Sequence, residues 1–186
     1  MIDDLRSRYL NVACLYGDYS DQKNQTVVNI LGTFLRQFIA TAQTPIPDEV
    51  ADRLLAIKHA GGKAGLEDNL SLLKIQLQQL DLAFICIDAV DELDKNIRWQ
   101  LLKKLKELGA RNTRFFFTGR DHIESEVPKQ FQILKENKVS ISACRQDIEE
   151  FVSERIQENC GQDPEAMDDA LAKDIIDSII EKSQGM

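Results

Sequence analysis

The stretch FICIDAVDEL, Phe84–Leu93, decides the fold of this chain. Its first four residues are apolar and predict a strand that is buried on both faces, as strands of parallel sheets are. Asp88 closes this strand, and Asp91 and Glu92 follow on the turn into the next helix. Short apolar runs alternate with amphipathic stretches around it. We therefore expect an α/β protein with a parallel sheet.

Strands and helices are expected on both sides of this stretch. Short apolar runs predict strands at Val12–Tyr16, Ala83–Ile87, Arg114–Thr118 and Val139–Ile141. Apolar residues at helical spacing predict helices over residues 24–40, 48–60, 66–80 and 95–108. Asp48 is the expected N-cap of the second of these helices. Residues 2–10 are expected to end a helix.

The pattern changes toward the C-terminus. From Arg145 onward it is wholly helical, and Asp163 and Pro164 suit the N-cap and first residue of a last helix. The alternation of strands and helices stops near Ala143. We therefore expect two parts, a core of residues 1–143 and a helical part of residues 144–186.

Composition narrows the possible functions. The 186 residues are 43% hydrophobic, which is enough for a core. The net charge of −8 argues against general binding to nucleic acids or anionic membranes, which requires basic patches. No apolar run reaches the roughly 18 residues of a membrane span, and the charged N-terminus shows no secretory signal. Four cysteines without a CxxC pair indicate free thiols in a reducing compartment rather than zinc or disulfide sites.

The three carboxylates of the central stretch are the clearest chemical signal. Ligands of open α/β sheets bind outside the carboxyl ends of the strands, where Asp88 is expected. Carboxylates there suit a cation such as Mg²⁺, which keeps several waters, while another carboxylate orients a water toward a phosphate. Alternatively, Asp91, Glu92 and Asp94 are helix caps that favour the helix dipole. That alternative does not account for Asp88, which closes an apolar strand.

A second polar group follows the next strand. The segment RFFFTGRDH, residues 114–122, is apolar until Thr118 and reaches Arg120 just beyond the strand. A guanidinium at this edge of the sheet can contact phosphate oxygens through its planar fork. The alternative is an ordinary surface arginine after a turn.

Several segments, in order, resemble the NACHT-type NTPase domain of the STAND class, in the nephrocystin-like form of fungal proteins with ankyrin or WD repeats. IDDLRSRY resembles the end of the helix after the phosphate loop. VACLYGDYSDQKNQTVVNILGTFLRQF resembles the second strand, its turn and the next helix. FICIDAVDEL resembles the Walker B strand and RFFFTGR the sensor strand. DIEEFVSERI and EKSQGM resemble parts of a helical subdomain, so the resemblance covers nearly the whole chain.

This resemblance implies an incomplete, AAA+-like P-loop NTPase fold with three layers, followed by the start of a C-terminal helical subdomain. It implies that Asp88 serves the water shell of Mg²⁺, that Asp91 and Glu92 are catalytic and polarise the attacking water, and that Arg120 senses the γ-phosphate. The implied parent protein is a cytoplasmic signalling NTPase. It would bind ATP or GTP, hydrolyse it slowly and switch oligomeric state, with other copies or protein partners and without nucleic acid or membrane.

One motif of that family is absent from the sequence. The family holds phosphates with GxxxxGKS or GxxxxGKT, whose backbone N–H groups and lysine surround them. The Gly62–Lys63 pair is followed by Ala64 and comes after a helix, so we expect a flexible loop there. We expect the phosphate loop and its strand upstream of Met1 and a chain truncated at both ends. Such a chain should bind nucleotide poorly and be inactive as an enzyme by itself.

Two other functions remain open from the sequence. One is a non-catalytic scaffold that pairs with intact relatives or with repeat domains, because a missing strand would expose apolar surface. A receiver-like domain with Asp88 as phospho-acceptor is less consistent with the residues. Such domains carry an acidic pair after the first strand, whereas Asp3 and Asp4 precede any expected strand.

Overall fold

The computed structural model describes residues 2–8, 10–41, 45–109, 111–120, 123, 126–131, 137–142, 144–160 and 168–183. The chain divides into two compact units, Met1–Ile133 and Leu134–Met186. The first unit contains the sheet, and the second contains two helices. Among the described residues, no helix combines the length and the apolar composition that crossing a bilayer requires.

Three parallel strands form the sheet of the first unit, in the order β1-β2-β3. They span Asn11–Tyr16, Ala83–Asp88 and Thr113–Phe117. The register places Asp88 beside Tyr16 and Ile87 beside Phe117. The carboxyl ends of all three strands therefore meet at one end of the sheet, and the predicted α/β class with a parallel sheet is confirmed.

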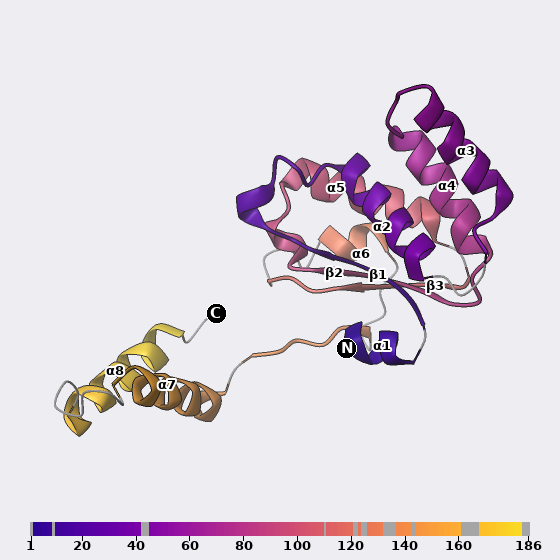
Figure 1. Ribbon diagram of the computed structural model, residues 1–186. Coiled ribbons are helices and arrows are strands. Elements are labelled where there is room, and N and C mark those ends of the chain that lie inside the picture. The colour runs from indigo at the N-terminus through magenta and orange to yellow at the C-terminus, as the bar shows by residue number, and fades with distance from the viewer. Residues whose placement is uncertain are drawn as a thin grey trace. The chain divides into compact units, whose positions relative to one another are not determined.

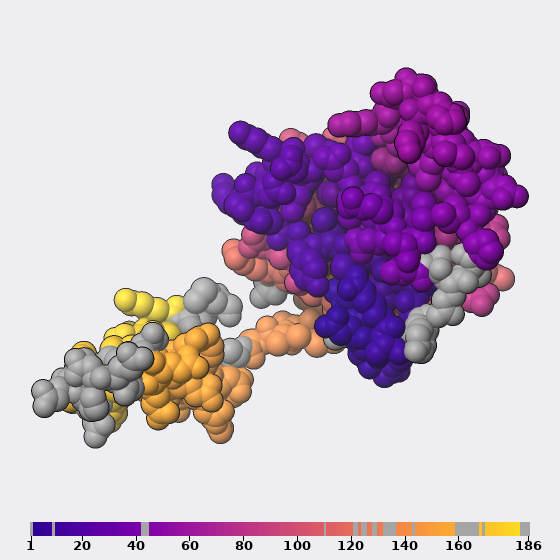
Figure 2. Space-filling view, viewed as in Figure 1, coloured from indigo at the N-terminus to yellow at the C-terminus, as the bar shows by residue number. Residues whose placement is uncertain are grey.

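Helices cover one face of this sheet (Figure 1). They are α2 (Val27–Thr41), α3 (Asp48–His59), α4 (Leu66–Gln78), α5 (Lys95–Leu108) and α6 (Glu126–Gln130), whereas α1 (Ile2–Ser7) lies on the opposite face. Two 3₁₀ turns, η1 (Tyr19–Asp21) and η2 (Val90–Glu92), follow β1 and β2. Atoms of α2, α3 and α4 cover most of the visible side of this unit in the space-filling view (Figure 2).

The hydrophobic core lies between these helices and the inner face of the sheet. Apolar side chains at helical spacing on α2, α4 and α5 meet alternate residues of the strands, as the two periodicities require. The largest fully buried side chains include Phe34, Phe38, Leu73, Ile85, Leu101 and Leu105. Packing in this core thus positions the three strands.

The opposite face of the sheet is only partly covered. It carries a mostly apolar groove of about 400 Å³ that includes Leu5, Phe84, Cys86, Arg114 and Phe116 in its lining. Phe116 is exposed, whereas Cys86 is buried, and its burial raises the pKa of the thiol. This face can therefore accept further apolar contacts.

The two edges of the sheet differ. On β1, the side-chain amide of Gln37 accepts a hydrogen bond from the Cys14 N–H at 2.9 Å and donates one to the Cys14 carbonyl at 2.8 Å. The outer edge of β1 is thereby blocked at its centre, which protects against pairing with another strand. No backbone group among the described residues pairs with the outer edge of β3.

The second unit contains α7 (Arg145–Cys160) and α8 (Asp169–Ser183). Val152 and Ile180 are its buried apolar residues among those described. Arg145 forms ion pairs with Glu149 at 2.6 Å on the same helix and with Asp177 of α8 at 3.2 Å. The Arg145–Asp177 pair therefore links the two helices at the surface of this unit.

Several element predictions need correction. Val139–Ile141 is not a strand, and its two apolar side chains are 79% and 91% exposed. A strand requires a neighbour for its backbone, and no described residue supplies one there. Asp48 is the first residue of α3 rather than its N-cap, which is Pro47 without a side-chain bond.

The boundaries toward the C-terminus fall as follows. The two units meet between Ile133 and Leu134, ten residues before the predicted boundary at Ala143, which lies outside the described residues. Asp163 and Pro164, the predicted start of the last helix, lie outside them as well. The described part of α8 begins after Asp168, whose carboxylate accepts a hydrogen bond from the Leu171 N–H at 2.7 Å.

Candidate functional site

Asp88 is the last residue of β2 and is exposed at the carboxyl end of the sheet. Thr118, just beyond β3, donates its hydroxyl hydrogen to Oδ1 of Asp88, and its Oγ1 accepts a hydrogen bond from the Ala89 N–H at 2.9 Å. The hydroxyl therefore fixes the orientation of the Asp88 carboxylate and leaves Oδ2 available to a ligand. The register explains this contact, because Ile87 and Phe117 are partners.

The turn after β2 packs directly against the turn after β1. Ala89 adopts the left-handed conformation, with φ 50° and ψ 49°, which turns the chain sharply after Asp88. The Gly17 N–H donates to the Asp88 carbonyl at 2.8 Å. A Cβ atom at Gly17 would lie 2.1 Å from the Ala89 carbonyl oxygen, so only glycine fits there without a shift.

Asp91 and Glu92 both face Arg120. The Arg120 Nε lies 3.6 Å from Asp91 Oδ2, and its Nη2 lies 3.4 Å from Glu92 Oε1. The Arg120 backbone N–H also donates to Asp91 Oδ1 at 3.3 Å. The Asp91 side chain is 5% exposed, whereas that of Arg120 is 74% exposed. One exposed cation thus neutralises two carboxylates, one of which is buried.

The turn after β1 contacts Glu92 from the other side. The Tyr19 N–H donates to Glu92 Oε2 at 3.2 Å, and the Gln22 amide donates to the Glu92 carbonyl at 3.2 Å. Within that turn, Asp18 accepts hydrogen bonds from the hydroxyl and N–H of Ser20, which lower the pKa of the Asp18 carboxyl. Two segments distant in sequence, the turn after β1 and the residues just beyond β3, therefore contact Glu92.

Arg98 of α5 binds the backbone of the acidic turn, Asp91–Leu93. Arg98 is only 6% exposed. Its guanidinium donates hydrogen bonds to the carbonyls of Asp91 and Leu93 and to the carboxylate of Glu126. Arg98 is not among the site residues that the sequence predicts. The sequence nevertheless contains a signal for a buried arginine. Arg98 lies three residues before Leu101 and seven before Leu105, on the apolar face of the helix, where a charged side chain requires partners.

The alternative reading of the acidic residues as helix caps holds for one of them. Asp94 is the N-cap of α5, and its carboxylate accepts hydrogen bonds from the N–H groups of Asn96 and Ile97 at 2.9 and 3.3 Å. Asp91 and Glu92 instead contact the segment beyond β3. The structure therefore separates the acidic residue that stabilises the helix from those that face Arg120.

The structure brings three of the four predicted residues into direct contact. Asp91, Glu92 and Arg120 form the ion-paired group, while Asp88 is bonded to Thr118. Among the described residues, no three His, Cys, Asp or Glu side chains gather as a metal cage. The oxygens of Asp88 and Thr118 suit a cation that keeps most of its water shell, as Mg²⁺ does, because Mg²⁺ needs only one or two protein ligands.

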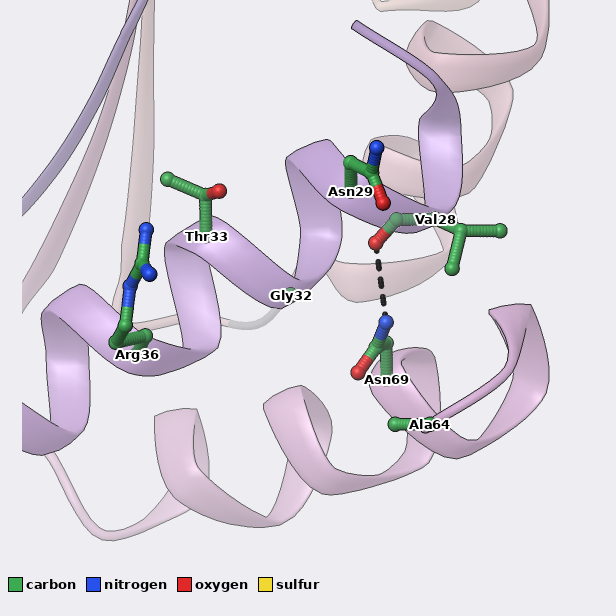
Figure 3. A pocket seen from close by; sticks show the side chains of 7 residues that line it. All are labelled: Val28, Asn29, Gly32, Thr33, Arg36, Ala64 and Asn69. Atoms are coloured by element: carbon green, nitrogen blue, oxygen red, sulfur yellow. Dashed lines mark hydrogen bonds between the residues drawn. The ribbon is translucent and has the colours of Figure 1, made fainter. Parts of the chain in front are cut away.

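A hollow elsewhere in the first unit does not gather such groups. It has a volume of about 390 Å³ and lies over Gly32 between α2 and α4 (Figure 3). The amide of Asn69 donates to the Val28 carbonyl at 3.0 Å, while the side chains of Thr33 and Arg36 point away from Asn69. The polar atoms do not converge on one point, so this hollow serves helix packing.

The chain was compared with known proteins. The family model described as nephrocystin 3, N-terminal, matches residues 1–120. This match includes Asp88, Asp91, Glu92 and Arg120. No curated protein and no solved structure matches the chain.

Proposed function

This chain belongs to the nephrocystin 3 N-terminal family, and on that premise we propose that it supplies the cation and γ-phosphate side of a NACHT-type nucleoside triphosphatase site. The observation that carries the proposal is the contact of Arg120 with Asp91 and Glu92 at the carboxyl ends of two adjacent parallel strands. Ligands of open α/β sheets bind at this end. The parent protein would bind ATP or GTP and use slow hydrolysis as an oligomerisation switch in the cytoplasm.

Each polar side chain has a distinct role in this proposal. Asp88 would hold the water shell of Mg²⁺, with its orientation set by the Thr118 hydroxyl. When bound, Mg²⁺ would neutralise the charge on the phosphate oxygens. Glu92, aided by Asp91, would accept a proton from the attacking water, as a positioned general base does. Arg120 would contact the γ-phosphate through its planar guanidinium.

Arg120 could exchange its contact with Glu92 for a contact with the γ-phosphate. An exposed ion pair contributes about 0–1 kcal/mol. This value applies to the pair of Arg120 with the partly exposed Glu92, whereas the buried Asp91 carboxylate also accepts a hydrogen bond from the Arg120 backbone N–H. Hydrogen bonds to a charged group contribute about 1.5–3 kcal/mol, so a phosphate can compete for the guanidinium. Binding of the phosphate would release the Glu92 carboxylate to face water. Ligand contact and activation of the base would thus be coupled through one arginine.

The phosphate loop must come from outside these residues, because the sequence contains no GxxxxGKS or GxxxxGKT. One observation supports an additional strand. The outer edge of β3 has no backbone partner among the described residues. We propose that a strand leading into the phosphate loop pairs with β3.

The first test is nucleotide titration of the 186-residue chain by calorimetry. We expect no saturable binding of Mg-ATP or Mg-GTP with a dissociation constant below about 1 mM, because the phosphate loop supplies most of the contacts with the phosphates. A micromolar dissociation constant would show that the reading of the missing loop is wrong.

The second test restores the loop. A strand and GxxxxGKS loop from another family member is fused before the chain, and binding and hydrolysis are measured. We expect binding of nucleotide, and a loss of hydrolysis of about a hundredfold in Glu92→Gln with binding retained. Asp94→Asn is the matched control, because Asp94 only caps α5. Equal hydrolysis by both variants in a fusion that binds nucleotide would refute the role of Glu92.

A second candidate is a non-catalytic interaction module. The open sheet face favours it, because Phe84 and Phe116 line an apolar groove that nothing among the described residues fills. Such a module would pair with another NACHT-type domain or with a repeat domain. Light scattering tests self-pairing through this face, because a clean monomer at high concentration would count against it.

A further inference from the structure

The backbone around Glu92 is held by long side chains from two other elements. The Arg98 Nη1 donates to the Asp91 carbonyl at 3.1 Å and to the Leu93 carbonyl at 3.0 Å. The Gln22 amide donates to the carbonyl between them, that of Glu92, at 3.2 Å. Three successive carbonyls of the acidic turn are therefore each bonded to a side chain that is not part of the turn.

The other edge of the Arg98 guanidinium binds a carboxylate. Its Nε and Nη2 donate to Glu126 Oε2 and Oε1 at 2.7 and 3.0 Å, a bidentate pair. The Arg98 side chain is 7% exposed and that of Glu126 is 28% exposed. Burying an arginine is costly unless its donors are bonded, and here four of its five N–H donors form hydrogen bonds. A charge held this way fixes geometry as well as stability.

Glu126 lies at the start of α6, a few residues after Arg120. Between them, Ile123 is buried, and its N–H donates to the Arg120 carbonyl at 3.2 Å. Ile123 also packs under Gly119, where a Cβ atom would lie 2.7 Å from its Cδ1. The guanidinium of Arg98 therefore joins the turn that carries Glu92 to the start of α6.

We propose that Arg98 is a positioning residue that sets the distance between Glu92 and Arg120. It binds the backbone on both sides of Glu92, and through Glu126 it binds the start of α6. It does not itself touch substrate. The proposal rests on the proposed function for its catalytic consequence, but its geometric part concerns the chain without any ligand.

Arginine alone among the cationic side chains can make this set of bonds. Its planar fork offers five N–H donors in fixed directions, whereas lysine offers a single ammonium group. Arg98→Lys keeps the charge near Glu126 and loses the simultaneous bonds to the two carbonyls. The charge swap of Arg98→Glu with Glu126→Arg keeps an opposite pair but leaves both carbonyls without a donor from position 98.

Hydrogen exchange of the 186-residue chain tests the geometric part. The reporters are the Glu92 and Leu93 amides, which bond within the turn to the carbonyls of Ala89 and Val90. In Arg98→Lys we expect these amides to exchange about tenfold faster relative to the amides of β2. Lys104→Met is the matched control on α5, because it removes ion pairs with Glu67 and Glu107 and should leave that ratio unchanged.

The double variant Arg98→Glu with Glu126→Arg separates the effect of stability from the effect of the lost carbonyl bonds. We expect it to recover part of the melting temperature lost in Arg98→Glu while the turn amides stay fast. If exchange at Glu92 and Leu93 rises only in parallel with exchange in β2, Arg98 has a general structural role and the inference is wrong. If Arg98→Lys does not fold, the ratio is measured in Glu126→Gln, where the same outcomes apply.

The catalytic consequence is tested in the fusion that carries the phosphate loop. Arg98→Lys should lower kcat about tenfold or more, because the general base Glu92 is misplaced. KM should change little, because the phosphate loop still binds the nucleotide. An unchanged kcat in a fusion that hydrolyses nucleotide would overturn the inference. A fusion that never binds nucleotide would instead count against the proposed function and would leave the exchange result standing.

Discussion

Gly17 illustrates how one small residue lets two turns meet. Its N–H donates to the Asp88 carbonyl, and a Cβ atom there would lie 2.1 Å from the Ala89 carbonyl oxygen. We expect Gly17→Ala to lower the free energy of unfolding by about 3 kcal/mol, the upper end of overpacking costs, because backbone atoms must move. Denaturant unfolding followed by circular dichroism measures this change.

Gly62 provides the matched control for that substitution. A Cβ atom there would meet the Ile57 carbonyl oxygen at 3.7 Å, an ordinary contact. Gly62→Ala should therefore be neutral or slightly stabilising, because it restricts the unfolded chain. Equal losses of stability at the two glycines would contradict the clash at Gly17.

Two glutamines make a second comparison at the scale of single residues. Gln76 of α4 is fully buried, and neither of its side-chain polar atoms has a hydrogen-bond partner among the residues that the structure describes. Gln37 bonds both backbone groups of Cys14. We expect Gln76→Met to raise the free energy of unfolding by about 1–2 kcal/mol and Gln37→Met to lower it by about 1 kcal/mol. Chemical denaturation of both variants checks the opposite signs, and the same sign for both would refute the argument.

At the scale of elements, α7 begins with a reciprocal cap. The Cys144 N–H donates to Asp147 Oδ2 at 2.9 Å, and the Asp147 N–H donates to the Cys144 sulfur at 3.4 Å. The backbone bond from Cys144 lowers the pKa of the Asp147 carboxyl. A lowered folded-state pKa stabilises the folded form above the unfolded value of about 3.9 and loses that contribution as pH falls through the folded pKa.

The first turn of α7 should therefore loosen in acid. We expect amide exchange at residues 145–148, corrected for the intrinsic pH dependence, to rise as pH is lowered from 6 to about 3. Asp147→Asn should show fast exchange already at pH 6 and a smaller change below it. If both proteins respond to acid alike, other carboxylates control this helix end.

Local signals explain why some elements were predicted closely. The helix Lys95–Leu108 was predicted with the bounds of α5, because Asp94 caps its start and Gly109 follows its last apolar residue. The predicted strand Val139–Ile141 failed because a strand depends on a neighbour that spacing in one segment does not reveal. Helices satisfy their backbone internally, and strands do not.

At the scale of the whole molecule, the two units differ in the extent of their hydrophobic cores. The first has an extensive core, whereas Val152 and Ile180 are the buried apolar residues of the described part of the second. We expect a fragment of residues 1–133 to melt cooperatively and one of residues 134–186 to lose helicity gradually, because short helices without a core are marginal. Circular dichroism melting curves test this, and a sharp transition in the smaller fragment would contradict it.

The sequence by itself determined the parallel α/β class, the place of Asp88 at a strand end and the position of Arg120 beyond the neighbouring strand. These follow from local apolar runs and from the rule that parallel strands end together. Only the tertiary structure decided that Arg120 contacts Asp91 and Glu92, that Thr118 holds Asp88, and that Arg98 anchors the turn from α5. Those contacts depend on strand register and helix packing, which bring together residues that no spacing along the chain relates.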